Sequence, residues 1–371
     1  MNHTAILLIF VVHSGLCMAG SFPGNDSITS NAPTLWADSA TVTRGPVDIT
    51  VTDSVLTTYG SHEDATGPSD AAEDVQSGVV SLGDGGIATL IFAVPLADGL
   101  GADLAVFENG FNSSFLELAH VEVSSDGINF IRFPSISQTQ TSTQIGAFSI
   151  GMIDPTNLHN LAGKYAAGLG TPFDLAELRG VSPHLDVSHI THVRVLDAVG
   201  SINPLYGTTD SLGNLINDPF KTNFDTGGFD LDAVGAMYAG PTTPETWTAF
   251  HFTTTTLDQD EGDPDGDQIP NLLEYALASD PLHWNPSPFR LSGIPANPTI
   301  HWSRSRYRAG VNLSLEASHD VSNWVTLTES SGTGPTMASI PGIVVTESSN
   351  GSQVSAGIAT GHSFFRLRAE R

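Results

Sequence analysis

The sequence has almost no cysteine, and this absence limits how the protein can be stabilised. Cys17 is the only one in 371 residues, and it follows an apolar stretch that runs from Ala5 to Val12. We interpret residues 1–19 as a secretory signal peptide ending in Cys17-Met18-Ala19, although no Lys or Arg precedes the apolar stretch. Cleavage there would leave no disulfide, so stability has to come from packed cores and bound ions. A lipid anchor on Cys17 is the less favoured alternative, because Ser14-Gly15-Leu16-Cys17 matches a lipobox poorly.

Positive charge is scarce as well. The chain has 13 Lys and Arg against 40 Asp and Glu, a formal net charge of −27, and its only lysines are Lys164 and Lys221. Such a surface repels phosphate backbones and anionic lipids, which excludes nucleic-acid binding. No apolar run after the N-terminal stretch is long enough to cross a bilayer, so we expect no transmembrane segment in the mature chain.

Short strands joined by turns account for the remaining composition. Charged residues make up only 14% of the chain, while it contains 37 Gly and 22 Pro, and apolar runs recur at short spacing between Gly/Asp turns. This predicts an all-β fold with two β-sandwich domains. The expected organisation is a signal peptide (1–19), a mobile leader (20–33), a jelly-roll-like sandwich (34–240), a linker (241–256), a calcium loop with a helix (257–284) and a C-terminal β domain (287–371).

The most specific motif lies between these two sandwiches. Aspartates stand at the first, third and fifth positions of a twelve-residue loop that begins at Asp263, and the run from Asp258 to Glu274 contains no Lys or Arg. Like charges crowded into one loop are unfavourable unless a hard cation lies between them, and calcium accepts six to eight oxygens in irregular geometry. The predicted ligands of Ca²⁺ are Asp263, Asp265, Asp267, Ile269, Asn271 and Glu274. The alternative is an acidic, solvated linker.

This spacing resembles the EF-hand-like calcium loops of thrombospondin type 3 repeats and dockerin-like secreted proteins. Two positions depart from the pattern: Gln268 stands sixth, where the family has Gly, and Pro270 stands eighth. The preceding Thr253–Thr256 segment does not suggest a helix, so we expect half a hand with only an exit helix. Apolar residues follow at helical spacing and predict that exit helix: Ile269, Leu272, Leu273, Ala276 and Leu277.

One pattern occurs twice, once in each predicted sandwich. Residues 122–130 and 316–324 share Glu-x-Ser-x-Asp-x-x-Asn-aromatic with identical spacing. A strand that ends at Ser, a turn capped by the Asp side chain, a left-handed Asn or Gly and an aromatic that opens the return strand would produce this pattern. We therefore expect a β-hairpin at both places. Chance similarity between two hairpins is the alternative.

Several motifs between residues 45 and 238 carry a family resemblance. They are Ser81-Leu82-Gly83-Asp84-Gly85-Gly86, Val106-Phe107-Glu108-Asn109-Gly110-Phe111 and Gly228-Phe229-Asp230-Leu231-Asp232-Ala233-Val234-Gly235. These segments resemble a family of secreted or surface proteins of Gram-negative bacteria. The hairpin at residues 122–130 and the final Asp-Leu-Asp-Ala-Val strand are also similar to galactose-binding-like jelly rolls. The segment after the calcium loop resembles C-terminal β domains of secreted proteins from Verrucomicrobia-like bacteria. The resemblance implies a secreted or cell-surface location but assigns no activity.

A second metal or ligand site is the weaker prediction. Glu108 and Asn109 end an apolar strand, and Asp230 and Asp232 alternate with apolar residues on another, so their oxygens could hold a second ion. Turn capping and solvated edges are the alternative. Glu108 and Glu117 could also serve as the carboxylate pair of a glycosidase.

These observations predict a function without catalysis. We expect an exported, calcium-stabilised surface or matrix protein whose recognition module binds extracellular glycan. One alternative is a carbohydrate-active enzyme, a glycoside hydrolase or lyase that uses paired carboxylates. The other is a purely structural surface component.

Overall fold

The fold is all-β, as predicted. A computed structural model describes residues 20–71, 78–110, 115–148, 153–240, 243–252, 260–294, 297–305, 308–347, 353–358 and 363–371. The predicted signal peptide, the residues 253–259 before the calcium loop and Phe111 of the family motifs lie outside these ranges. Within them, the only α-helices are α1 (Pro244–His251) and α2 (Asn271–Leu277), and no helix is long and apolar enough to cross a membrane.

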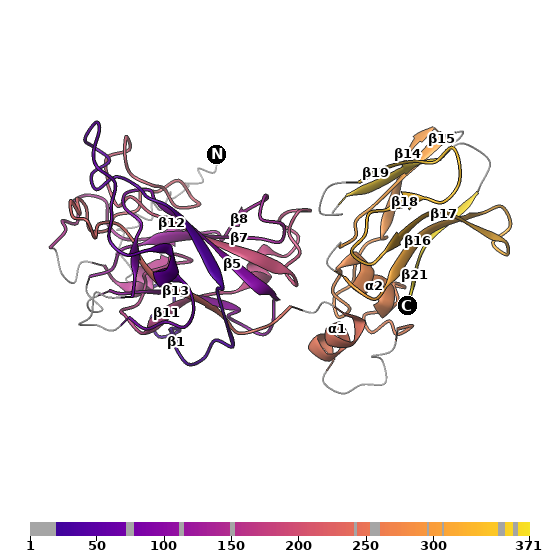
Figure 1. Ribbon diagram of the computed structural model, residues 1–371, viewed down its shortest axis with the longest axis horizontal. Helices are drawn as coiled ribbons and strands as arrows, with labels where there is room; N and C mark the ends of the chain where they lie inside the picture. Colours follow the sequence, from indigo (N-terminus) through magenta and orange to yellow (C-terminus); the bar gives the residue numbers. More distant parts are fainter. Residues whose placement is uncertain are drawn as a thin grey trace, which may run out of the picture.

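The N-terminal part of the chain forms two main antiparallel sheets (Figure 1). The first has the order β1-β11-β6-β13-β2, with β4 paired to β13, and the second has the order β3-β5-β12-β7-β8. The strands are β1 (Ile28–Thr29), β2 (Leu35–Trp36), β3 (Ser39–Thr43), β4 (Val80–Ser81), β5 (Ile87–Leu96), β6 (Leu104–Glu108), β7 (Ala119–Ser124), β8 (Ile131–Arg132), β11 (Leu169–Phe173), β12 (Ile190–Asp197) and β13 (Asp230–Ala236).

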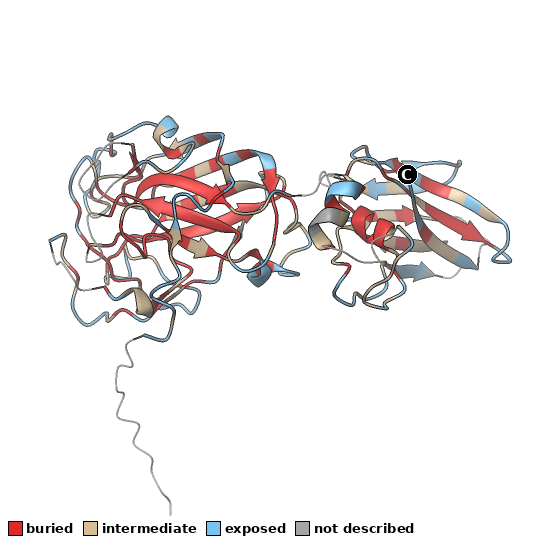
Figure 2. Ribbon diagram, turned by 90° about the horizontal axis from the view of Figure 1, so that it is seen from below, coloured by how far each residue is buried: buried red, intermediate tan, exposed pale blue. Residues whose placement is uncertain are grey.

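A core of apolar side chains from both sheets lies between them. Val106 and Val234 come from the first sheet, Val121 and Val193 from the second, and all are buried. Strands β7 and β13 are buried along their whole length, and Figure 2 shows buried strands inside the N-terminal part. The described residues of this part also contain three short 3-10 turns and one small pair of strands outside the two sheets. These are η1 (His62–Ala65), η2 (Pro155–Asn157) and η3 (Leu175–Leu178), and the small pair is β9 (Ile136–Ser137) with β10 (Leu158–His159).

Two four-stranded antiparallel sheets form the C-terminal part, with orders β14-β15-β20-β19 and β18-β17-β16-β21. Their own core includes Trp302, Leu315 and Val354, together with Tyr275 of α2 and Trp247 of α1. The strands are β14 (Phe289–Ile294), β15 (Asn297–Trp302), β16 (Asn312–Ser318), β17 (Trp324–Ser331), β18 (Met337–Ala338), β19 (Val344–Glu347), β20 (Val354–Gly357) and β21 (Phe364–Glu370).

The helix predicted after the calcium loop is confirmed. Helix α2 follows Pro270 and ends at Ala278, which adopts a left-handed conformation (φ 58°). Its buried side chains Leu272, Tyr275 and Ala276 belong to the C-terminal core. The amphipathic stripe identified Leu272 and Ala276, but it did not include the fully buried Tyr275, and its members Leu273 and Leu277 are only partly buried. Helix α1 lies in the segment expected to be a linker and was not predicted, although Thr243 caps it and Pro244 occupies its first turn.

Both predicted hairpins form. Strand β7 pairs with β8, and β16 pairs with β17. In the first turn Asp126 Oδ1 accepts hydrogen bonds from the backbone amides of residues 128 and 129, at 2.9 and 2.8 Å. In the second, Asp320 Oδ1 accepts the equivalent pair from residues 322 and 323, again at 2.9 and 2.8 Å. The left-handed residue of the first turn is Gly127 (φ 71°), as expected, but in the second turn it is Val321 (φ 57°), so the expectation of Asn or Gly is wrong there. The shared pattern therefore encodes one turn geometry twice.

Candidate metal centre

The three loop aspartates converge. Asp263, Asp265 and Asp267 each offer a carboxylate oxygen, and these oxygens lie within 4.8 Å of one another. Backbone amides shape the loop around the first of them: Gly266 N donates to Asp263 Oδ1 at 2.9 Å and Gln268 N donates to Asp263 Oδ2 at 3.0 Å. Gln268 adopts the left-handed conformation (φ 73°) that glycine usually supplies at the sixth position.

Glu274 supplies a fourth carboxylate from the first turns of α2. Its side chain is fully buried, and Ser279 Oγ donates to its Oε1 at 3.2 Å. Its Oε2 is buried and has no hydrogen-bond partner among the described residues. Burial, and then the charges of Asp265 and Asp267, raise the pKa of Glu274 to about 8. The twelfth-position carboxylate therefore lies in the field of the loop aspartates. It does not belong to the set whose oxygens all lie within 4.8 Å of one another, so its role as a ligand stays a prediction.

Asp265 shows the same lack of a donor. Its Oδ2 is buried without a hydrogen-bond partner among the described residues, and burial with the neighbouring Asp267 and Asp263 raises its pKa. No Lys or Arg in the described part of the chain forms an ion pair with any of the four carboxylates; the nearby Arg371 and Arg179 contact Asp260 and Asp280 instead. Ionising these carboxylates without a positive partner costs free energy, and a bound cation would remove that cost.

The other two predicted ligands lie next to these carboxylates in the chain. Ile269 is buried, and its amide donates to Asp267 Oδ1 at 2.8 Å. Asn271 is buried at the start of α2, and its backbone N–H donates to the carbonyl oxygen of Gly262 at 2.8 Å. Their roles as ligands stay predictions. The donors are all hard oxygens with several negative charges, a set that fits Ca²⁺ better than a soft or nitrogen-preferring metal.

The weaker predicted site lies among buried carboxylates of the N-terminal sheets. Glu108 is 2% exposed, Asp230 5% and Asp232 2%. Burial, followed by the charge of Asp230, raises the pKa of Glu108 well above its usual value. Burial raises the pKa of Asp230 to about 7, although Ser81 and Asn109 donate hydrogen bonds to it. Asn109 and Asp230 are thus brought together.

Asp232 is held differently. Ser69 Oγ donates to its Oδ2 at 2.5 Å and the amide of Asp70 donates to its Oδ1 at 3.2 Å. Among the described residues, Glu108, Asp230 and Asp232 are not one of the sets of three carboxylates whose oxygens lie within 4.8 Å. A second ion at these residues stays a prediction with less geometric support than the loop.

Glu117 joins this group of buried acids. It is 6% exposed, and burial, followed by the charges of Asp230 and Glu108, raises its pKa well above the usual range. Two further aspartates that the sequence analysis did not single out lie near it, but each accepts backbone amides. Asp197 accepts from Phe229 N at 2.7 Å, and Asp218 accepts from Leu118 N at 2.9 Å.

A second converging set was not predicted from the sequence. Asp98, Asp103 and Asp174 also offer oxygens within 4.8 Å of one another. Arg179 Nε donates to Asp98, while Asp103 accepts the amides of Gly99 and Leu175, each at 2.6 Å. Asp174 caps the 3-10 turn η3 by accepting the amide of Ala176 at 2.9 Å. These carboxylates come from segments 76 residues apart, so no local motif could have revealed them.

Comparisons with known proteins add no family. No model of a known protein family matches the chain, and a search of curated proteins finds no similar sequence. The family resemblances of the motifs and of the calcium loop therefore stay predictions.

Proposed function

We propose that the chain is an exported all-β protein, stabilised by calcium at residues 263–274, that binds extracellular glycan and does not catalyse a reaction. The observation that carries the calcium part is Glu274. Its carboxylate is fully buried, its Oε2 has no donor among the described residues, and its pKa is raised to about 8 beside Asp265 and Asp267. A divalent cation at this point would neutralise several charges at once, which a single proton would not.

The ion would act on the C-terminal part of the molecule. Glu274 belongs to α2, whose neighbours Leu272 and Tyr275 pack in the C-terminal core. The loop is also tied to the segment after the helix, because Asn285 N donates to Asp267 Oδ2 at 2.8 Å. Calcium binding would therefore hold the loop, α2 and residue 285 in one arrangement, a structural rather than a signalling role.

Burial of the carboxylate pair favours binding over catalysis. A glycosidase needs two carboxyl groups on either side of a bond that the substrate brings between them. Glu108 and Glu117 are only 2% and 6% exposed, a state in which a sugar chain would not reach both. The glycan part of the proposal rests on the resemblance of the N-terminal motifs to galactose-binding-like jelly rolls.

Two measurements test the proposal. Thermal unfolding of the chain from residue 20 onward, with calcium and with a chelator, tests the ion; equal melting temperatures under both conditions would remove the calcium part. A glycan array probed with the calcium-loaded chain tests recognition. Hydrolysis or elimination products released from any bound glycan would replace the binding function with the enzymatic alternative.

A further inference from the structure

Arg290 differs from the other cationic side chains of this acidic protein. Every other Lys and Arg that the structure describes contacts a carboxylate, apart from Arg44, which donates to backbone carbonyls. The Arg290 side chain has no ion pair and no hydrogen bond among the described residues, and Arg290 is exposed. With 40 Asp and Glu in the chain against 13 Lys and Arg, a guanidinium without a carboxylate is an available anion-binding group.

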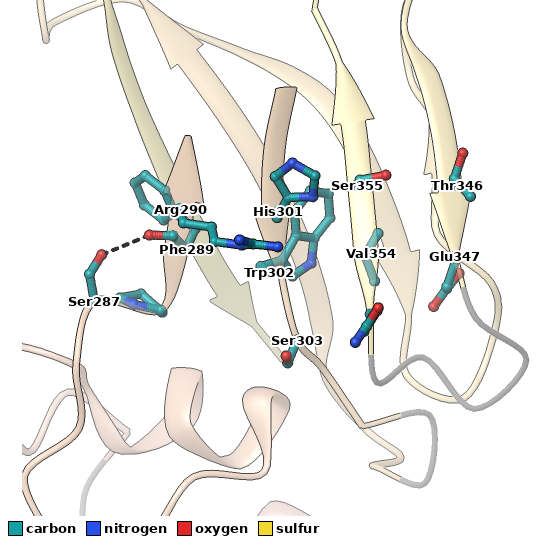
Figure 3. A pocket seen from close by; sticks show the side chains of 12 residues that line it. Ser287, Phe289, Arg290, His301, Trp302, Ser303, Thr346, Glu347, Val354 and Ser355 are labelled. Atoms are coloured by element: carbon teal, nitrogen blue, oxygen red, sulfur yellow. Dashed lines mark hydrogen bonds between the residues drawn. The ribbon is translucent and has the colours of Figure 1, made fainter. Parts of the chain in front are cut away.

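Arg290 is one end of a polar row that crosses a whole sheet. It lies opposite His301 on β15, His301 lies opposite Ser355 on β20, and Ser355 lies opposite Thr346 on β19. Directly opposed residues of antiparallel strands project from the same face, so these side chains stand side by side over about 14 Å, three strand spacings. Figure 3 shows the Arg290 side chain extended across the sheet toward His301.

The other row of the same strands faces inward. Trp302 and Val354 are buried in the C-terminal core, and Phe289 packs against it. This leaves the polar row on the outer face, where Ser292 Oγ lies 2.7 Å from His301 Nε2 and orients the imidazole. The sheet therefore presents a cation, an imidazole and hydroxyl groups at fixed spacing, on a rigid support.

A cavity of about 520 Å³ adjoins this row, and its lining is rich in hydrogen-bonding groups. Ser287, Ser303 and Gln353 contribute hydroxyl and amide groups to the lining, and Figure 3 shows Ser287 and Ser303 near Arg290 and His301. The one acidic lining residue, Glu347, is already neutralised: Arg304 Nε donates to its Oε1 at 2.8 Å and Thr336 N donates to its Oε2 at 2.6 Å. No carboxylate in the lining thus competes with a ligand for Arg290.

We propose that this face of the C-terminal part binds an anionic polysaccharide. Arg290 donates to a carboxylate or sulfate group of the sugar chain, and His301, Ser355 and Thr346 form hydrogen bonds with its hydroxyl groups. Three serines, a threonine and a glutamine line the cavity beside Pro288, Phe289, Trp302 and Val354. This mixture of hydrogen-bonding and apolar groups suits a polyhydroxylated sugar chain. The site lies outside the N-terminal sheets to which the proposed function assigns glycan recognition.

The test is binding of the calcium-loaded chain from residue 20 onward to three polymers at about 0.15 M salt. These are polygalacturonate, which carries carboxylates, chondroitin sulfate, which also carries sulfates, and the neutral polymer dextran. The chain's net charge of −27 repels anionic polymers, so binding of either anionic polymer, and not of dextran, requires a positive charge at the contact. Which of the two binds more tightly identifies the preferred group. The arginine variants distinguish a contact with Arg290 from bridging by calcium.

Variants separate this site from general charge. Arg290→Gln is expected to weaken binding about tenfold or more, the scale of a hydrogen bond to a charged group. The matched control Arg368→Gln makes the same change of charge at an arginine that already contacts Glu316 and Glu370, and it should bind like the parent. Thr346→Glu, at the exposed far end of the row, should also weaken binding, because it adds a negative charge without touching Arg290.

Three results would overturn the inference. They are equal weakening by Arg290→Gln and Arg368→Gln, equal binding of dextran and the anionic polymers, and no binding of either anionic polymer by the parent. Circular dichroism and melting temperatures of the variants establish that each is folded. A chelator added to the same samples reports separately on the proposed calcium site through its effect on the melting temperature.

Discussion

Two sets of three aspartates converge in this molecule, and they differ in what surrounds their charge. In the first set, Asp98, Asp103 and Asp174, the carboxylate oxygens accept hydrogen bonds from Arg179 and from backbone amides. In the second set, Asp263, Asp265 and Asp267, backbone amides of the loop and of Asn285 donate the hydrogen bonds. No Lys or Arg of the described chain forms an ion pair with these aspartates, and the buried Glu274 adds a fourth carboxylate.

The comparison shows that convergence alone does not define a cation site. Both sets have oxygens within 4.8 Å of one another. In the first set Arg179 already provides the positive charge, although one oxygen of Asp98 has no hydrogen-bond partner among the described residues. In the loop the charge is uncompensated by protein groups, and that is the physical reason to place a calcium ion there and not at Asp98.

The largest expected effect comes from breaking the loop site. Calcium at a hundredfold excess over its Kd should stabilise the protein by about 2.7 kcal/mol. Glu274→Gln should abolish most of that gain, because it removes a charged ligand at the twelfth position. Melting temperature measured against calcium concentration checks this. The control Glu261→Gln changes an exposed acid of the same run and should keep the calcium response; loss of the response in both variants would argue against a specific site.

The Asp98 set should respond to pH and not to calcium. Burial raises the pKa of Asp103 to about 7, above its usual value of 3.8. Between about pH 4 and 7, Asp103 is therefore protonated in the folded state and ionised in the unfolded state. The free energy of unfolding falls as the pH rises through this window. With calcium saturating, we expect Asp103 to contribute a loss of about 2 kcal/mol between pH 5 and 8. Asp103→Asn should remove this part, whereas the loss from other buried acids with raised pKa values, such as Asp230, should remain. Denaturant unfolding at several pH values checks it, and a profile that rises with pH would contradict it.

Removing the protein's own cation is expected to have a smaller effect. Arg179→Met leaves the carboxylate of Asp98, only 3% exposed, without its ion pair. Because Arg179 itself is 41% exposed and solvent screens the pair, we expect a loss of about 1 to 3 kcal/mol. Chemical denaturation of parent and variant measures it. The matched control is Arg290→Met, at an exposed arginine whose side chain has no ion pair among the described residues. Rescue of Arg179→Met by calcium would show that this set can also hold a metal.

The smallest effect is expected where amides satisfy a carboxylate completely. Asp126 accepts the amides of residues 128 and 129 and the side chain of Asn129, so it needs neither a cation nor a proton. Asp126→Ala should cost about 1 kcal/mol, the usual scale of a lost side-chain cap, with an unchanged calcium response. Asp320→Ala should act in the same direction in the C-terminal hairpin. A calcium-dependent loss in either variant would mean that these turns, too, bind an ion.

Much of the fold and of the loop could be predicted because the signals are local. The hairpins at residues 122–130 and 316–324 follow from side chains that cap their own turns, within three residues of the aspartate. The exit helix follows from a stripe of apolar residues at helical spacing. Helix α1 was missed because its eight residues lie in a segment that reads as Thr/Pro-rich linker, and packing of Trp247 in the C-terminal core stabilises it.

The sequence by itself determined the all-β class, the two capped hairpins and the ordered carboxylates of residues 263–274, since each depends on groups within one turn or one strand. Only the tertiary structure decided that Glu274 is buried without a donor for one oxygen. It also decided that Asp98 meets Asp174 and that Arg290 stands in a row with Thr346. Sheet register and core packing bring together residues that lie tens of positions apart in the sequence. No spacing of residues along the chain predicts which of these distant residues become neighbours.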